Sequence, residues 1–364
     1  MSLLYDDDQR AIAEESRRVL NARVSKDRLL GLLEQTGAID TAFWDTVVEQ
    51  GWTALGISEE NGGIGLGLVE LGLIAQAAGA ATSGAPFLAS GFAVAQALAA
   101  SDDREAQRRF LPGIAAGEVK TAIAFGEGTE ILPEPPTTTF AGGRLSGVKE
   151  GVTGGHHGDL ALVWAWHDGS PALVVAELES VSRQAVDTFD NARLVADLAF
   201  ADTPATLLFG GAQAREQTLA ALARLAVVTA HEQTGGAEEL MRLGRDYALT
   251  RKAFGQAIGG FQSVKHRLAE LYGLVEIARA NCIHAASLEG TSGFLEAAAT
   301  ARISATEAYD TAARDVIQIH GGIGVTWEAG LHLHMRRARS LAIECGNLLF
   351  WEDLLVEQLT GVAP

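Results

Sequence analysis

The chain has 364 residues, of which 48% are hydrophobic, so it can bury a large core divided over roughly two or three domains. Its 28 basic and 46 acidic residues give a net charge of −18, which argues against nucleic acid or an anionic membrane surface as the main partner, because either would repel it. Cys282 and Cys345 are far apart in the sequence and indicate neither a disulfide framework nor a zinc site, so a reducing cytoplasm fits the composition.

The beginning of the chain predicts a helix and not an export signal. Asp6, Asp7 and Asp8 precede an amphipathic pattern, and the segment lacks the basic region and apolar run of a signal peptide. No apolar stretch reaches the roughly 18 residues that cross a bilayer. We therefore expect a soluble, cytoplasmic protein without a membrane span.

Hydrophobic periodicity divides the chain into three predicted domains. Residues 1–118 show apolar positions at helical spacing and predict an N-terminal helical domain. Residues 119–212 contain short β-leaning runs separated by turn residues, and because no helices alternate with them we expect an antiparallel β domain. Residues 213–364 return to long helical patterns.

This last region predicts a four-helix bundle in a protein of the α+β class. The four helices are expected over residues 215–249, 262–288, 293–319 and 339–359.

The connection between the first two of these helices carries the motif RxxFG. Arg251 and Phe254 are three residues apart, so we expect them to share a face of the terminating helix, with Gly255 ending it and Gln262 opening the next helix. A plain helix-loop-helix corner with a solvated arginine is the alternative.

A second segment, QIHGGIGVTWEAG, follows the third predicted helix. Gly321, Gly322 and Gly324 allow close approach to a phosphate, but the segment is not a dinucleotide fingerprint. A helix precedes it in place of a strand, and Trp327 stands where the third glycine would be.

Together the two segments resemble the two signatures of the acyl-CoA dehydrogenase family. GISEENGGIGLG, residues 56–67, resembles the amino-terminal loop of that family, and residues 147–165 resemble the core of its β domain. The resemblance therefore extends over nearly the whole chain. It implies an N-terminal helical domain, a middle antiparallel β domain and a C-terminal four-helix bundle.

In that family, the arginine and the glycine segment of one subunit reach the FAD held by the neighbouring subunit. Glycines permit close backbone approach, and arginine pairs bidentately with phosphate oxygens. By matching positions, the resemblance implies FAD contacts at Arg251, Phe254, Gln262, Gln318, Gly321, Gly322, Val152 and Thr153.

The resemblance also implies a reaction, α,β-desaturation of an acyl-CoA thioester. A carboxylate removes the α-proton, the flavin accepts the β-hydrogen as hydride, and hydrogen-bond donors stabilise the developing enolate. An electron-transfer flavoprotein is the expected electron acceptor, and the process belongs to lipid metabolism.

The catalytic base is the weakest part of the match. Most members carry a glutamate immediately before a glycine at the start of the last helix, where this chain has Cys345, with Glu344 one residue earlier. One residue on a helix turns a side chain by about 100°, so Glu344 need not face the same cavity. Some relatives carry the base on the first helix of the bundle, but the matching positions, Leu225 and Ala226, are not acidic.

The β domain departs from the family pattern as well. Glu127 matches a family glutamate, but Gly126 replaces a threonine and Gly151 replaces a tryptophan, while Val152 and Thr153 are retained. The residues that would contact FAD held by a neighbouring subunit are thus kept. The residues with which this chain would bind its own FAD are partly replaced. The sequence resembles the incomplete subunit of bacterial heteromeric acyl-CoA dehydrogenases, so we expect a heterotetramer in which a partner chain supplies the base.

Three alternatives remain at this point. The chain is a self-sufficient homotetramer with Glu344 as base, a non-catalytic scaffold on the same fold, or a flavin oxidase acting on another substrate. A metal site is not expected, because the pairs His156 and His157, and His332 and His334, have no third ligand in register.

Overall fold

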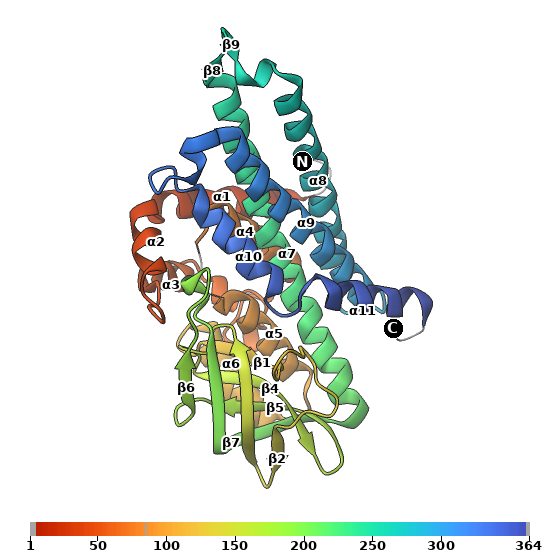
Figure 1. Ribbon diagram of the computed structural model, residues 1–364. Coiled ribbons are helices and arrows are strands. Elements are labelled where there is room, and N and C mark those ends of the chain that lie inside the picture. Colours follow the sequence, from red (N-terminus) through yellow and green to blue (C-terminus); the bar gives the residue numbers. More distant parts are fainter. Residues whose placement is uncertain (1–4, 84–85, 362–364) are drawn as a thin grey trace. The chain divides into compact units, whose positions relative to one another are not determined.

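The computed structural model describes residues 5–83 and 86–361, and the order of the elements is helices, strands, helices (Figure 1). The described residues form two compact units. One draws on Gly31–Leu71 and Gly84–Leu225, and the other on Met1–Leu30, Gly72–Ser83 and Ala226–Pro364. The predicted domain limits at residues 118 and 212 stay predictions. The predicted α+β class is confirmed.

The amino-terminal region is helical, as expected. Its helices are α1 (Asp7–Arg23), α2 (Lys26–Leu33), α3 (Thr41–Glu49), α4 (Leu68–Ala80), α5 (Phe87–Ala100) and α6 (Arg104–Ala115), with short 3₁₀ turns at Trp52–Ala54 and Glu59–Asn61. The predicted start of α1 is confirmed, because the Asp6 side chain accepts a hydrogen bond from the Gln9 backbone and the Gln9 side chain accepts one from the Asp6 backbone. None of the described helices has the length and apolar composition needed to cross a membrane.

The middle region is a sheet that closes on itself. Its strands are β1 (Thr121–Ala124), β2 (Thr139–Ala141), β3 (Arg144–Val152), β4 (Leu160–His167), β5 (Ser170–Glu177), β6 (Ser182–Ala185) and β7 (Ala196–Gly210), with a 3₁₀ turn at Asn191–Arg193. The ring runs from β4 through β5, β7, β3 and β2 back to β4.

The expectation of a purely antiparallel sheet is wrong for two pairs. β1 and β2 each pair with β4 in parallel, while the other pairs of this sheet are antiparallel. A parallel pair needs a long connection, and residues 125–159 supply it between β1 and β4 without any helix. The absence of helices between strands therefore does not exclude parallel pairing.

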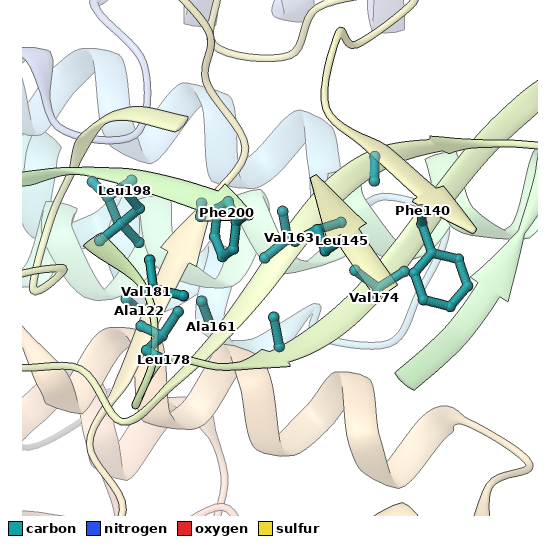
Figure 2. Close-up of a cluster of buried hydrophobic side chains, with 14 of the residues drawn as sticks. Ala122, Phe140, Leu145, Ala161, Val163, Val174, Leu178, Val181, Leu198 and Phe200 are labelled. Atoms are coloured by element: carbon teal, nitrogen blue, oxygen red, sulfur yellow. The ribbon is translucent and has the colours of Figure 1, made fainter. Parts of the chain in front are cut away.

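The interior of this sheet is apolar. Side chains from several strands, among them Leu145, Val163, Val174 and Leu198, meet in one buried cluster (Figure 2). Each of these four side chains is fully buried. Successive residues of a strand point to opposite faces, and these four point into the interior of the closed sheet.

The carboxyl-terminal region is helical, but its helices differ from the predicted four. They are α7 (Gly211–Thr250), α8 (Gln262–Ser287), α9 (Phe294–His320), α10 (Leu331–Ile343) and α11 (Leu348–Thr360), joined in part by the hairpin β8 (Lys252–Ala253) and β9 (Gln256–Ala257) and by 3₁₀ turns at Ile258–Gly260 and Gly321–Val325. The helix predicted over 339–359 is two helices, because Cys345 and Gly346 have φ of 54° and 116°, which no right-handed helix can contain. Asn347 then caps α11.

Helices α4 and α7 approach each other through glycines in the unit that includes Gly72–Ser83 and Ala226–Pro364. A Cβ added at Gly79 would lie 1.8 Å from the Glu232 carbonyl oxygen, and one added at Gly235 would lie 1.8 Å from the Gln76 carbonyl oxygen. Any larger residue at either position would force the helices apart.

Candidate functional site

The ends of α7 and α9 meet through two stacked rings. Tyr247 lies on His320 with ring centroids 4.1 Å apart. Arg251 follows one helical turn after Tyr247 and donates its backbone N–H to the Tyr247 carbonyl at 2.8 Å, while Gly321 directly follows His320. The structure therefore brings Arg251 and the glycine segment to neighbouring helix ends, a region that we call the bundle tip (residues 249–262 and 318–327).

The RxxFG motif is not a helix face. α7 ends at Thr250, and Phe254 and Gly255 form the turn of the β8–β9 hairpin with φ of 50° and 81°. The expectations that Gly255 ends the helix and that Arg251 and Phe254 share one of its faces are therefore wrong. A turn with two left-handed residues closes a tight hairpin, and glycine makes its second position easy.

Arg251 is an exposed cation for which the described residues provide no partner. Within the part of the chain that the structure describes, its guanidinium makes no hydrogen bond or ion pair. In a protein of net charge −18, arginines commonly find a carboxylate, as Arg267 does with Asp315 at 2.8 Å. An unpaired guanidinium keeps its donors for an anion that arrives from outside.

The glycines of the second signature differ in what they need. Gly321 has a φ of 64°, and Gly324 is packed so closely that an added Cβ would lie 2.6 Å from the Ile317 carbonyl oxygen. Gly322 has neither constraint, and an added Cβ would meet no described atom within 4 Å. Its backbone is open to a ligand, which fits a group held by main-chain amides.

The remaining predicted contacts of this region are exposed. Gln262 opens α8, as predicted, and Gln318 lies on the last turn of α9. The Phe254 side chain is 97% exposed and touches the Phe261 ring edge-on. Other apolar side chains of the bundle tip are exposed too, namely Leu249 (66%), Ile323 (52%) and Val325 (72%).

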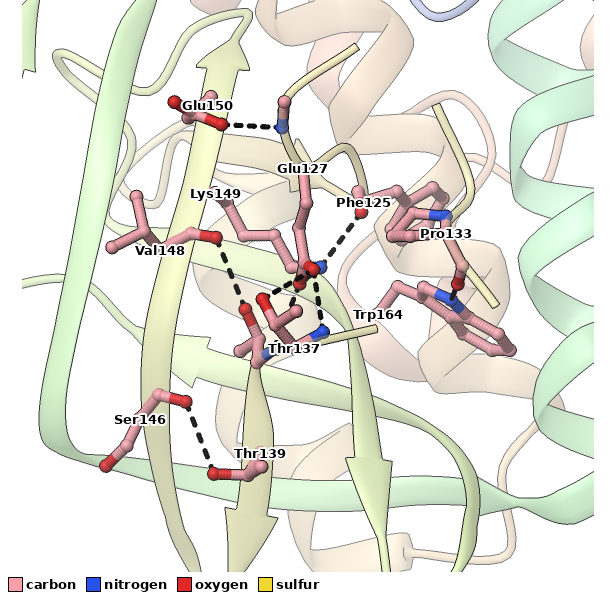
Figure 3. Close-up of polar contacts among 12 residues, drawn as sticks. Phe125, Glu127, Pro133, Thr137, Thr139, Ser146, Val148, Lys149, Glu150 and Trp164 are labelled. Carbon is pink, nitrogen blue, oxygen red and sulfur yellow. Dashed lines mark hydrogen bonds and ion pairs between the residues drawn. The ribbon is translucent and has the colours of Figure 1, made fainter. Parts of the chain in front are cut away.

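The β domain uses Glu127 internally. One carboxylate oxygen accepts from Lys149 Nζ at 2.6 Å and from the Thr138 backbone, and the other accepts from the backbone and hydroxyl of Thr137, both at 2.7 Å (Figure 3). Lys149, whose side chain is fully buried, also donates to the Phe125 carbonyl at 2.9 Å. Glu127 thus holds the loop before β2 against β3.

The pKa values of Glu127 and Lys149 reflect this pairing. Burial alone would raise the pKa of Glu127, but the hydrogen bonds from Lys149, Thr137 and Thr138 outweigh it and lower the pKa to about 2. Burial lowers the pKa of Lys149 to about 8, against the opposing effect of Glu127. At pH 7 Glu127 is therefore ionised and most of Lys149 is protonated.

Lys149 was missed in the sequence, although a signal was present. Along β3 the inward positions include Leu145 and Val152, and Lys149 is buried on the same strand. A lysine at a predicted inward position requires a buried partner, and Glu127 is the acid that the family pattern places in the same domain.

Val152 and Thr153 differ in what they can offer a cofactor. The Val152 side chain belongs to the buried core of the sheet, so only its backbone is available to a ligand, whereas Thr153 is partly exposed. Gly151, in the position of the family's tryptophan, has a φ of 63° and open space around it. Among the described residues, no atom lies within 4 Å of a Cβ added there.

Glu344 caps the end of α10 and lies outside any helix. Its side chain is only 9% exposed, and the left-handed Cys345 follows it. Arg302 of α9 donates to the carbonyls of Leu341 and Glu344, the latter at 3.0 Å, and so holds this turn in place. The role of Glu344 as base stays a prediction.

The second base location is apolar, as the sequence indicates. Leu225 and Ala226 on α7 are both buried. About two turns further along the helix, Glu232 is the next acidic side chain. It pairs with the buried Arg337 of α10 at 2.6 Å, and Arg337 also donates to the carbonyls of Thr82 and Ser83, so Glu232 serves the packing of the bundle.

No three histidine, cysteine, aspartate or glutamate side chains among the described residues form a group that could hold a metal ion.

The chain is similar to known proteins over most of its length. Two family models match, one described as Acyl-CoA dehydrogenase, N-terminal domain, over residues 6–118, and one described as Acyl-CoA dehydrogenase, C-terminal domain, over residues 215–348. The acyl-CoA dehydrogenase IpdE2 of Mycobacterium tuberculosis is 32% identical over 304 residues, which cover 83% of this chain and 82% of that protein.

Solved structures share the fold over the full length. A glutaryl-CoA dehydrogenase from Mycobacterium smegmatis in complex with FADH2 has a TM-score of 0.89 at 20% identity, covering 100% of this chain and 97% of that one. The ChsE4-ChsE5 complex from Mycobacterium tuberculosis has a TM-score of 0.89 at 23% identity, with 99% of each chain covered.

The chain belongs to the acyl-CoA dehydrogenase family. This family consists of oxidoreductases that act on CH–CH bonds, and its cofactor is FAD. The expected family, fold and cofactor are thereby confirmed. The bundle tip fits a diphosphate-bearing cofactor, because a guanidinium without a partner among the described residues and an open glycine backbone lie at neighbouring helix ends.

Proposed function

We propose that this chain is one of two different subunits of a heteromeric acyl-CoA dehydrogenase, which desaturates an acyl-CoA thioester between its α and β carbons. One observation carries the proposal: the bundle tip is open for a cofactor, while Cys345 stands at the family's base position. The bundle tip of this chain contacts FAD that is bound mainly by a partner chain. The partner also supplies the carboxylate that removes the α-proton.

At the tip, each residue has a role that follows from its chemistry. Arg251 would pair with the pyrophosphate through its guanidinium, and Gly321 and Gly322 would let the backbone approach the same group. Gln262 and Gln318 would add amide hydrogen bonds, and Phe254 would supply apolar contact area.

In the β domain, the Val152 backbone and the Thr153 hydroxyl would meet the flavin. When bound, FAD takes up the β-hydrogen as hydride. The thiol of Cys345 is a poor replacement for a carboxylate base, because an unperturbed cysteine has a pKa of about 8.5 and is mostly protonated at neutral pH.

The assembly and the surroundings are part of the same proposal. The similar ChsE4-ChsE5 complex is named for two different proteins, which accords with a heterotetramer. We assign an electron-transfer flavoprotein as the acceptor that reoxidises the flavin. Cys282 and Cys345 are free thiols, which accords with a reducing cytoplasm.

The first test is the visible spectrum and the FAD content of the chain purified alone and after co-expression with a second acyl-CoA dehydrogenase chain. We expect a colourless protein alone and a yellow complex with about one FAD per pair of chains. A yellow homo-oligomer with about one FAD per chain and high dehydrogenase activity would overturn the proposal.

A self-sufficient homotetramer with Glu344 as base is the second candidate, because Glu344 is the acid adjacent to the family's base position and is nearly buried. In that case Glu344→Gln would abolish turnover of the homo-oligomer while leaving its FAD spectrum intact. Glu328→Gln, on the exposed segment after the glycines, is the matched control. Activity that survives Glu344→Gln would eliminate this candidate.

A further inference from the structure

A hollow of about 210 Å³ lies in the unit that contains α10, and no residue of the bundle tip lines it. It is formed by the end of α1, the start of α2, the end of α4, one residue of α7 and the start of α10. Its apolar walls include Leu20, Val24, Leu29, Leu243 and Leu331. Neither the proposed FAD contacts nor Glu344 line it.

The charge at this hollow has one sign. Lys26 is the charged side chain on its wall, and none of the described residues that line it is acidic. The Lys26 ammonium donates to the Glu328 carbonyl at 2.6 Å, which holds it near the start of α10. Burial is the main cause that lowers the pKa of the neighbouring His332, and the cations of Arg336 and Lys26 lower it further against a backbone hydrogen bond with Trp327. Both cations therefore lie near the start of α10.

The helix that begins at the hollow adds to this potential. α10 is 13 residues long, and its N-cap, Gly330, is left-handed and provides no side-chain cap. The first N–H groups of a helix have no partner within it and carry partial positive charge. Gly330 and Leu331 both line the hollow, so this end of the helix faces it.

A buried polar side chain completes the wall. His334 is 7% exposed, and its Nδ1 lies 3.0 Å from the buried Tyr309 hydroxyl. Its Nε2 makes no hydrogen bond with any described residue. Burial and the nearby Arg337 lower the pKa of His334 to about 3, so the ring is neutral at physiological pH and offers a hydrogen-bonding atom to a ligand in the hollow.

We propose that this hollow binds a short aliphatic carboxylate. The carboxylate meets the Lys26 ammonium and the N-terminus of α10, and the alkyl chain lies against the leucines. The volume corresponds to roughly seven water molecules at about 30 Å³ each, which suits a chain of about eight carbons. The site requires no FAD and no partner chain, so its test is independent of the test of the proposed function.

Isothermal titration calorimetry of the purified protein with octanoate tests the proposal, with octanol and octyl phosphate as matched probes. We expect one octanoate per chain, and at least tenfold weaker binding of octanol, which lacks the charge. Lys26→Met should weaken octanoate at least tenfold, Lys26→Arg should retain it, and Ala80→Leu, which fills the wall, should abolish it. Lys265→Met, an exposed lysine on α8, is the control and should bind as the unaltered protein does.

Several outcomes would overturn the site. These are no octanoate binding at millimolar concentration, equal affinity for octanol, or unchanged affinity in both Lys26→Met and Ala80→Leu. Binding of octyl phosphate without octanoate would overturn the assignment to a carboxylate. Circular dichroism of each variant separates loss of binding from loss of folding. If Ala80→Leu does not fold, Lys26→Met and Lys26→Arg decide the test, and equal octanoate affinity of these two variants would overturn the site.

Discussion

The bundle tip and the loop around Glu127 have opposite relations to their surroundings. At Glu127 every hydrogen bond is made inside the chain, with Lys149, Thr137 and Thr138 as donors. At the tip Arg251 has no described partner and the Gly322 backbone is open. Two residues that both match the family's motifs therefore differ in their availability to a ligand. Glu127 has become part of the packing, and Arg251 remains available for binding.

The largest effect should come from breaking the closed region. Lys149→Met leaves the Glu127 carboxylate buried without its cation, which costs about 3–5 kcal/mol for a buried ion pair. We expect the free energy of unfolding to fall by that amount in urea denaturation followed by circular dichroism. Lys265→Met, an exposed lysine, should change it by less than about 0.5 kcal/mol. Equal stability of the two variants would mean that the pair contributes nothing.

At the open region, a change should affect binding and leave stability intact. Arg251→Met removes a charge-assisted contact with a phosphate, worth about 1.5–3 kcal/mol, or about tenfold to more than a hundredfold in FAD affinity. FAD release from the assembled complex measures it, with Lys252→Met as the neighbouring control. A loss of thermal stability without any loss of FAD would show that Arg251 is structural.

The Glu127 pKa predicts an acid-sensitive fold. Its value of about 2 in the folded chain lies below that of an unfolded glutamate, so the pair stabilises the fold fully above about pH 4.5 and progressively less as the pH falls toward 2. Glu127→Gln should cost about 1–3 kcal/mol at neutral pH and flatten this decline. Urea midpoints at about pH 6, 4 and 3 measure both effects. Parallel pH profiles of the two proteins would refute the assignment.

The smallest effects should separate two glycines within the open region. Gly324→Ala meets the Ile317 carbonyl oxygen and should destabilise the fold by about 1 kcal/mol or more. Gly322→Ala meets no described atom, so its melting temperature should hold while FAD binding weakens several-fold. If Gly322→Ala retained full FAD affinity, its backbone would not be the site of approach.

The sequence predicts the periodic parts of this protein well. The amphipathic patterns place α8 and α9 within one residue of their observed ends, because long helices repeat the same signal many times. The sequence-based prediction fails where the backbone conformation of a single residue ends or redirects an element. The turn at Phe254 and Gly255 and the break at Cys345 each depend on left-handed residues, and phenylalanine and cysteine carry no such signal.

Long-range pairing was the other limit. Lys149 and Glu127, or Glu232 and Arg337, are far apart in the sequence, and only the folded chain brings them within 2.6 Å. The candidate FAD residues were found through short motifs, yet their exposure and lack of partners are properties of the structure alone.

The apolar side chains at the bundle tip have a consequence for how copies of this chain meet. Phe254 and Val325 expose large apolar side chains to water, which favours association with another surface. Two identical copies, however, each bring a net charge of −18 and repel one another at distances within the screening length. A less acidic chain would approach the same apolar surface faster, so salt should speed self-association of this chain more than its pairing with such a partner.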